Sequence, residues 1–352
     1  MNICTATDQS AWDQFLSEQQ YRPFLQSWTM GEVYKQIGQQ AIRLEIREGN
    51  ELIGICQAII VPARRGKHLA VSYGPVLKED VIDNPSVLEE ISKSLKEIAK
   101  EHQCSFIRLS PFISANNPLE LAGSRKSPLH LLAEHIWYIP LQNPNPFTGE
   151  ESDSNEKVTE EEILKGMRKN HRNLIRRATK EGVEIIKSDD PIRDLPKFIE
   201  LHEETRKRHK FTPYTNDFFR AQVELFSKRD ECTLYIAKYN GETIASSVHM
   251  HTFGETSYHH GASTAKYHKI PASYLLQWTA IQDAIERGDR VYNFWGIAPK
   301  DQKKHPFAGV TTFKTGFGGQ MLNIQHCTDI PVNSKYYATI AFEYYRKWRR
   351  GF

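Results

Sequence analysis

A lysine set among glycines and aromatic residues lies near the end of the sequence, in GVTTFKTGFGGQ from Gly309 to Gln320. Transfer of an acyl group from an activated ester to an amine needs the amine held against the carbonyl and a cation where the oxyanion develops. Lys314, between Phe313 and Phe317 and beside glycines that allow close approach, suits that task. An exposed lysine beside a hairpin turn explains the same residues. Spacing alone favours this second interpretation, because strand-like residues precede the glycines.

A second basic stretch, KGMRKNHRNLIRRATK at residues 165–180, carries seven Lys or Arg. Its apolar residues Met167, Leu174 and Ile175 predict a helix with one partly apolar face. Such a helix can dock on nucleic-acid phosphates, and a solvated basic helix has the same pattern. Both interpretations stay open from the residues alone.

Four histidines lie close together in the sequence, at His249, His251, His259 and His260. The first two share one face of a predicted strand, as metal ligands can. No Cys or Asp lies near them at the spacing of a known metal site. We therefore expect no metal and expect these histidines to line a binding groove.

The composition is that of a globular protein, with 39% hydrophobic and 25% charged residues, which excludes disordered and collagen-like chains. A length of 352 residues predicts two domains. The net charge of +3 allows polyanionic partners without requiring them. Five scattered cysteines predict reduced thiols and a cytoplasmic location. The N-terminus lacks the features of a signal peptide, and no run of about 18 apolar residues predicts a transmembrane span.

Two segments with the same order of elements must position these residues. Each begins with a hairpin whose turn is Gly-Asn or Asn-Gly, at residues 41–61 and 232–252. A third strand, a helix and a fourth strand follow in each. They are predicted at residues 68–77, 85–103 and 104–111 in the first segment and 256–263, 271–289 and 290–297 in the second. The sequence therefore predicts an α/β (α+β) protein of two tandem domains with mixed sheets.

The polar stretch from Leu141 to Glu162, rich in Pro and Asn, predicts a linker between these domains. We place the first domain at residues 1–145 plus 320–352 and the second at residues 146–319. A helical segment before each hairpin completes an order that resembles the acetyltransferase-like (GNAT-like) fold. That fold holds coenzyme A on an Arg- and Gly-rich turn after its central strand. Neither corresponding turn here has paired glycines, which disfavours coenzyme A.

Three motifs carry a more specific resemblance. They are QSWTMGEVYKQIG at residues 26–38, MRKNHRNLIRRATKEGVEI at 167–185 and FKTGFGG at 313–319. With SYGPVL at 72–77 and YLLQW at 274–278, the chain resembles the Fem family (FemABX-like) over nearly its whole length. Members of this family are non-ribosomal peptidyltransferases that add amino acids from aminoacyl-tRNA to the peptidoglycan stem peptide. No pair of long amphipathic helices is predicted between residues 186 and 233, so the resemblance is to the compact form without a coiled-coil arm.

The resemblance implies catalytic roles for Lys314 and Phe313, with the lysine stabilising the transition state or the tRNA acceptor end. Lys35 then contacts the pyrophosphate of the acceptor, for which an ammonium group is a good partner. The basic stretch at residues 165–180 then docks on the tRNA acceptor stem. The family also has an acid where Ser110 precedes Pro111 in this chain. We expect that no protein base replaces it, because an activated ester needs little acid–base help.

The resemblance assigns three further substrate-binding residues. Arg208 would clamp a phosphate or a carboxylate through its planar fork, and a solvated helix end explains this arginine equally well. An aromatic residue follows this arginine in the family, and either Tyr214 or Phe211 takes its place, of which we select Tyr214. Tyr258 is the nearest match to the aromatic residue before the Gly-Ala-Ser turn.

The C-terminal stretch SKYYATIAFEYYRKWRRGF predicts a helix. Tyr337, Ala341, Tyr345 and Trp348 lie on one face of it, with several cations near its end. A membrane-surface helix has this pattern, and so does a terminal helix packed on the first domain with its cations at the negative end of the helix dipole. We favour packing, because the apolar face is aromatic and partly polar.

The leading functional hypothesis is an aminoacyltransferase (EC 2.3.2-type) that forms the peptidoglycan interpeptide bridge. Its first domain would bind the UDP-linked or lipid-linked muropeptide precursor, and its second the co-substrate aminoacyl-tRNA. We expect no other cofactor and a monomer. We also expect a cytoplasmic location, and peripheral contact with the membrane stays an open alternative. Two alternatives are a coenzyme A-dependent N-acyltransferase of the same fold and a non-catalytic RNA- or precursor-binding relative. The absent coenzyme A turn weighs against the first alternative, and retention of Lys35 and FKTGFGG weighs against the second.

Overall fold

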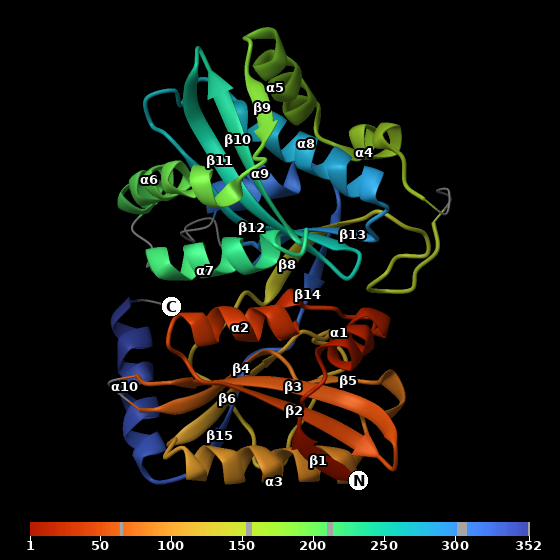
Figure 1. The fold of residues 1–352 in the computed structure, drawn as a ribbon, viewed down its shortest axis with the longest axis vertical. Helices are drawn as coiled ribbons and strands as arrows, with labels where there is room; N and C mark the ends of the chain where they lie inside the picture. Colours follow the sequence, from red (N-terminus) through yellow and green to blue (C-terminus); the bar gives the residue numbers. More distant parts are fainter. Residues whose placement is uncertain (64–65, 153–156, 210–213, 301–307, 351–352) are drawn as a thin grey trace. The chain divides into compact units, whose positions relative to one another are not determined.

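The computed structural model describes residues 1–63, 66–152, 157–209, 214–300 and 308–350. The chain divides into two compact units, Met1–Glu134 with Asn323–Phe352 and His135–Leu322. Each unit contains one mixed sheet with helices packed on it (Figure 1). The α/β fold class expected from the sequence is therefore confirmed. The first boundary differs from residue 145, because residues 135–140 form a strand that pairs with a strand of the second unit.

The sheet of the first unit has the order β1-β2-β3-β4-β6-β15-β7, with β5 paired to β3. Its strands are β1 (Asn2–Thr5), β2 (Ala41–Glu48), β3 (Glu51–Val61), β4 (His68–Tyr73), β5 (Val76–Leu77), β6 (Phe106–Pro111), β7 (Arg125–Lys126) and β15 (Thr328–Pro331). Its α-helices are α1 (Gln9–Glu18), α2 (Trp28–Gln36), α3 (Pro85–Glu101) and α10 (Lys335–Arg350). Figure 1 shows α3 across one face of this sheet and α1 and α2 across the other.

The sheet of the second unit has the order β14-β8-β13-β12-β11-β10-β9. Its strands are β8 (His135–Pro140), β9 (Glu184–Lys187), β10 (Cys232–Tyr239), β11 (Glu242–Thr252), β12 (Glu255–Ser263), β13 (Val291–Gly296) and β14 (Gln320–Asn323). Its α-helices are α4 (Glu160–Gly166), α5 (Lys169–Lys180), α6 (Pro191–His209), α7 (Asn216–Ser227), α8 (Ala272–Arg287) and α9 (Ala308–Thr315). Within the described ranges the longest helix is α6, at 19 residues, and with α7 it packs on the sheet rather than forming an arm.

The repeated order of elements follows from local sequence signals. The two predicted hairpins form, and their turns place Gly49, Asn240 and Gly241 at positive φ, as tight hairpin turns require. The helix α3 begins where the Asn84 side chain accepts from Ser86 N–H and Pro85 takes the first helical position. Its apolar residues recur with the period of a helix and pack into the core of the first unit. The same sequence of three strands, a helix and a strand occurs in both units, as predicted.

The stretch before the glycines of the FKTGFGG motif is a helix, so the predicted hairpin is wrong. Thr311 and Thr312 favour strands by propensity, but each has a partner that holds the helical turn. Thr311 Oγ1 accepts from Ala298 N–H at 2.8 Å, and Thr312 Oγ1 donates to Ala308 O at 3.2 Å. Gly318 and Gly319, at φ of 88° and 89°, lead the chain away into β14. Contacts from the rest of the unit therefore override local propensity here.

The C-terminal helix α10 packs on the first unit through a different face from the one predicted. Tyr336 and Thr339 are buried, whereas Tyr337, Tyr345 and Trp348 are exposed. Glu343 faces inward, where it pairs with Arg108 at 2.7 Å. The aromatic stripe predicted to pack is therefore the outer face of the helix. Among the described helices, none is both long enough and apolar enough to cross a membrane.

Candidate functional site

The parallel strands β12 and β13 of the second unit pair over only part of their length. Their register runs from Glu255 opposite Val291 to Ser257 opposite Asn293 and ends there. Beyond this point Trp295 has a positive φ of 67°, a strained conformation for a bulky residue and one that clusters at functional sites. In the first unit the corresponding strands β4 and β6 stay paired from end to end. The second unit therefore has a split between two central strands.

Lys314 bridges the strands on either side of this split. Its Nζ donates to Gly296 O at 2.7 Å, at the end of β13, and lies 5.8 Å from the ring centroid of Tyr258 on β12. The side chain is buried, with 7% of the residue exposed. Burial disfavours the charged form and lowers the pKa of Lys314 from 10.5 to about 7. A proton at this position can therefore be gained or lost near neutral pH.

Phe313 forms part of an aromatic wall beside the lysine. Its ring lies 5.0 Å from Tyr274 and 5.4 Å from Phe317, both in edge-on contact. Phe317 is fully buried in the core of the second unit, which Tyr258 also contacts. The structure thus brings Lys314, Phe313 and Tyr258 together in the second unit, and the roles that the resemblance assigns to them stay predictions.

The start of the basic helix α5 holds the end of α9 in place. Arg168 N–H donates to Gly316 O at 2.9 Å, and His171 Nε2 donates to Phe313 O at 2.9 Å. Burial lowers the pKa of His171, which favours the neutral ring with its proton on Nε2. A Cβ on Gly316 would lie 1.9 Å from the His171 ring, so only glycine fits there. Sequence reasoning missed His171. The available signal was its place in the motif at residues 167–185, which carries the same family resemblance as FKTGFGG.

A bulge in β12 sends neighbouring side chains to opposite faces of the sheet. Tyr258 pairs with His249, whereas His260 pairs with Val248, so His259 is the extra residue. Tyr258 stacks on His249, 5.3 Å away, and His260 contacts Phe219 of α7. The histidines are therefore divided between the two faces. Within the described residues no group of three His, Cys, Asp or Glu is arranged to hold a metal.

Arg208 and Tyr214 approach β12 from the side of α6 and α7. Arg208 donates to Ser263 O at 3.2 Å, and the Tyr214 ring lies 5.4 Å from His260. Tyr214 is 46% exposed and stacks on Phe218. These two residues therefore lie on the opposite face from Lys314, and their predicted roles stay predictions. Phe211 falls outside the described residues.

Lys35 belongs to an ordered polar network in the first unit. It pairs with Glu32 at 3.0 Å, and Glu32 also accepts from Arg43 at 2.7 Å. Arg43 lies over the Trp28 ring at 3.9 Å and would collide with any side chain at Gly31. The motif around Lys35 is thus explained by packing, and Lys35 itself is half exposed. Ser110, the residue before Pro111, is fully buried.

The turn after β12 is occupied by a carboxylate. Glu204 Oε1 accepts from Ala265 N–H at 2.6 Å and from Thr264 Oγ1 at 3.2 Å. Pro271, at the start of α8, has no N–H to offer. This turn is where the fold would hold the pyrophosphate of coenzyme A, and Glu204 places a negative charge there instead. The expectation that this chain does not use coenzyme A stays a prediction.

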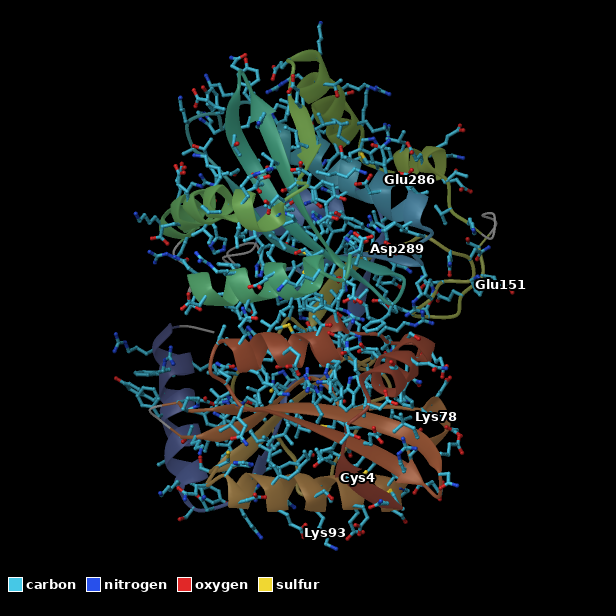
Figure 2. The ribbon with its side chains drawn as sticks, viewed as in Figure 1. Cys4, Lys78, Lys93, Glu151, Glu286 and Asp289 are labelled. Carbon is cyan, nitrogen blue, oxygen red and sulfur yellow. The ribbon has the colours of Figure 1, made fainter. Side chains whose placement is uncertain are left out.

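A pocket of about 330 Å³ opens beside the glycines of the FKTGFGG motif. Its lining includes Gly318 and Gly319 together with Glu150, Glu151 and Glu162. Glu151, labelled in Figure 2, reaches toward solvent. Three carboxylates repel phosphates, so this pocket does not suit a nucleic-acid backbone. The cations of α5 suit a nucleic-acid backbone better than this pocket does, since Lys169, Arg176 and Lys180 are exposed.

Comparisons with known proteins match both halves of the chain. The model of the FemAB family matches residues 7–125, and that of the acetyltransferase (GNAT) domain matches residues 165–311. Aminoacyltransferase FemA of Staphylococcus aureus is 25% identical over 144 residues, which cover 40% of this chain and 33% of that protein. FemA of Staphylococcus epidermidis is 32% identical over 83 residues, which cover 24% of this chain and 20% of that protein.

A crystal structure of FemX shares the fold over 97% of this chain and 100% of that chain, with a TM-score of 0.79 and 18% identity. The matched regions span a third or less of the FemA relatives, so the activity of those proteins does not transfer by similarity alone. The family models, the FemA relatives and the shared fold agree with the resemblance in the sequence motifs. Together these findings support a Fem-family protein with GNAT-like domains, in which the FemAB model matches part of the first unit and the GNAT model part of the second.

Proposed function

We propose that this chain is an aminoacyltransferase that moves an amino acid from aminoacyl-tRNA to the side-chain amine of a peptidoglycan stem peptide. The observation that carries the proposal is Lys314, held in the split between β12 and β13 by Gly296 O and the Tyr258 ring. The FemA relatives are aminoacyltransferases by name, which supports the same reaction class. Glu204 at the turn after β12 weighs against coenzyme A as the donor.

In the proposed reaction the amine of the acceptor attacks the ester carbonyl of the aminoacyl-tRNA. A C–N bond forms, the C–O bond to the ribose breaks, and the amine proton passes through water to the departing ribose oxygen. Lys314, when protonated, stabilises the oxyanion that develops between these steps. The aromatic wall of Phe313 limits the access of bulk water and so strengthens this charge interaction. The exposed cations of α5 bind the phosphates of the tRNA acceptor stem.

The test is to incubate the protein with charged tRNA pools and with nucleotide-linked or lipid-linked muropeptide precursors. Mass spectrometry should reveal a precursor heavier by one or more amino-acid residues. No mass increment with any tRNA, together with acylation from acyl-coenzyme A, would contradict the proposal.

Lys314→Ala should lower kcat by roughly 10²- to 10³-fold, the usual effect of losing one oxyanion donor, and should leave KM for the precursor nearly unchanged. Lys266→Ala is the matched control, because Lys266 lies in the same unit in an exposed ion pair with Glu242. The control should retain full turnover. An equal loss in precursor binding would make Lys314 an anchor for substrate rather than a catalyst.

A further inference from the structure

The outward face of α10 gathers exposed aromatic side chains. Among the described residues, four of the eight most exposed large apolar or aromatic side chains lie on this one helix. They are Tyr337, Tyr344, Tyr345 and Trp348, and Trp348 is 78% exposed. Their positions in the helix, at spacings of seven, eight and eleven residues, place them on one side. The first unit covers the opposite side, where Tyr336 and Thr339 are buried.

The charges of α10 are also divided between its two sides. Its one acidic residue, Glu343, faces inward and pairs with Arg108. Arg349, next to Trp348 in the helix, is exposed, and Arg125 of β7 lies 5.8 Å from the Tyr337 ring. The outward face therefore combines aromatic rings with positive charge and carries no acid.

We propose that this face of α10 docks on an anionic lipid surface. Trp and Tyr rings are amphipathic and settle at the level of lipid headgroups. Lys and Arg beside them are attracted to anionic lipids. The helix has 16 residues and one packed side, so it lies in the plane of the surface with its outward face against the headgroups.

The charge pattern favours lipid over a second copy of the chain. A symmetric dimer through this face would bring the same cations of two copies together with no acid to pair them. An anionic surface offers the complementary charge for every cation on the face. The proposal goes beyond the transfer reaction, because it assigns a location to the protein and does not depend on any donor or acceptor.

The test is sedimentation of the full chain with vesicles of phosphatidylcholine alone or mixed with phosphatidylglycerol. We expect binding to the mixed vesicles that weakens as salt is added. Trp348→Ala should weaken this binding roughly tenfold, through lost apolar burial. Arg349→Glu should weaken it at least about fivefold, through lost attraction.

Two substitutions outside this face are matched controls. Lys93→Glu reverses a charge on the exposed side of α3 in the same unit (Figure 2), and Ile192→Ala removes an exposed apolar side chain from α6. Both should bind vesicles like the original chain. Equal binding to phosphatidylcholine alone, or binding that neither Trp348→Ala nor Arg349→Glu weakens, overturns the proposal.

Two further measurements test the other occupants of the face. If the same variants lose affinity for tRNA but not for vesicles, the face binds RNA and the proposal fails. If the chain dimerises without lipid and Trp348→Ala abolishes the dimer, the face joins two copies and the proposal fails. None of these assays measures aminoacyl transfer, so a negative result here leaves the proposed function standing.

Discussion

At the scale of single residues, the surroundings of Lys314 give its side chain a protonation behaviour that an ordinary lysine lacks. A surface lysine stays charged through the physiological range, but burial against Gly296 O and the Tyr258 ring lowers the pKa of Lys314 to about 7. The unfolded chain then binds more protons than the folded chain between about pH 7 and 10.5. The contribution of Lys314 to the free energy of unfolding therefore rises with pH across that window.

The same pKa predicts a pH dependence of catalysis. Because only the protonated form stabilises an oxyanion, the advantage of the original enzyme over Lys314→Ala should shrink as the pH rises through about 7. The quantity to measure is the ratio of kcat/KM of the two enzymes between pH 6 and pH 8.5. Titration of the acceptor amine affects both enzymes equally and cancels in this ratio. A ratio that stays constant over the range would contradict an electrostatic role for the Lys314 ammonium.

At the scale of elements, α5 and α9 act together. The N-terminal end of α5 holds two carbonyl oxygens at the end of α9, Gly316 O through Arg168 N–H and Phe313 O through His171. Trp137 of β8 donates to Gly318 O at 2.7 Å and secures the next turn of the chain. The position of Lys314 therefore depends on contacts between elements far apart in the sequence.

Gly316→Ala tests this coupling. The added methyl group would overlap the His171 ring, at 1.9 Å, and push α9 away from α5, so turnover should fall at least about tenfold. Gly309→Ala, within α9 itself, is the matched control, since among the described residues no atom outside the helix backbone lies within 4 Å of its added methyl group. That control should keep its activity and gain up to about 1 kcal/mol in stability, because alanine favours a helix over glycine. Equal activity in both variants would show that the α5 contact does not position Lys314.

At the scale of the whole molecule, the two units share one order of elements and differ at their central parallel strands. In the first unit β4 and β6 stay paired, and in the second β12 and β13 part after three residue pairs. The same order of elements thus gives fully paired central strands in the first unit and partly separated central strands in the second. The C-terminal segment completes the sheet of the first unit, because β15 pairs with β6 and β7.

A buried charge network secures this C-terminal segment. Arg108 of β6 donates two hydrogen bonds to Asp329 of β15, at 2.7 and 2.9 Å, across 221 residues of sequence. Asp329→Ala would leave the buried arginine with only Glu343, so the free energy of unfolding should fall by roughly 3–5 kcal/mol. Urea denaturation measures this loss. Glu90→Ala, which breaks an exposed pair with Lys93, should cost at most about 1 kcal/mol, and similar losses in both variants would contradict the network's role.

The sequence by itself determined the repeated order of three strands, a helix and a strand, because hairpin turns, helix caps and hydrophobic periodicity are local signals that the structure follows. It also indicated the family, through motifs whose residues are close in the chain. It did not determine that residues 308–315 form a helix, because their propensity favours a strand and only the contacts of Lys314, Thr311 and Phe313 with other elements hold the helix.

Tertiary structure alone decided which side of each element is covered. Periodicity places Tyr337 and Trp348 on one face of α10, but the inward charge pair of Glu343 turns that face outward. The bulge at His259 likewise separates Tyr258 from His260, although both lie on one strand. The pKa of Lys314 depends on burial by segments that are distant in sequence. Packing and burial depend on contacts with residues that are distant in the sequence. The sequence pattern therefore indicates which residues are candidates for the site, and the tertiary structure decides what surrounds them.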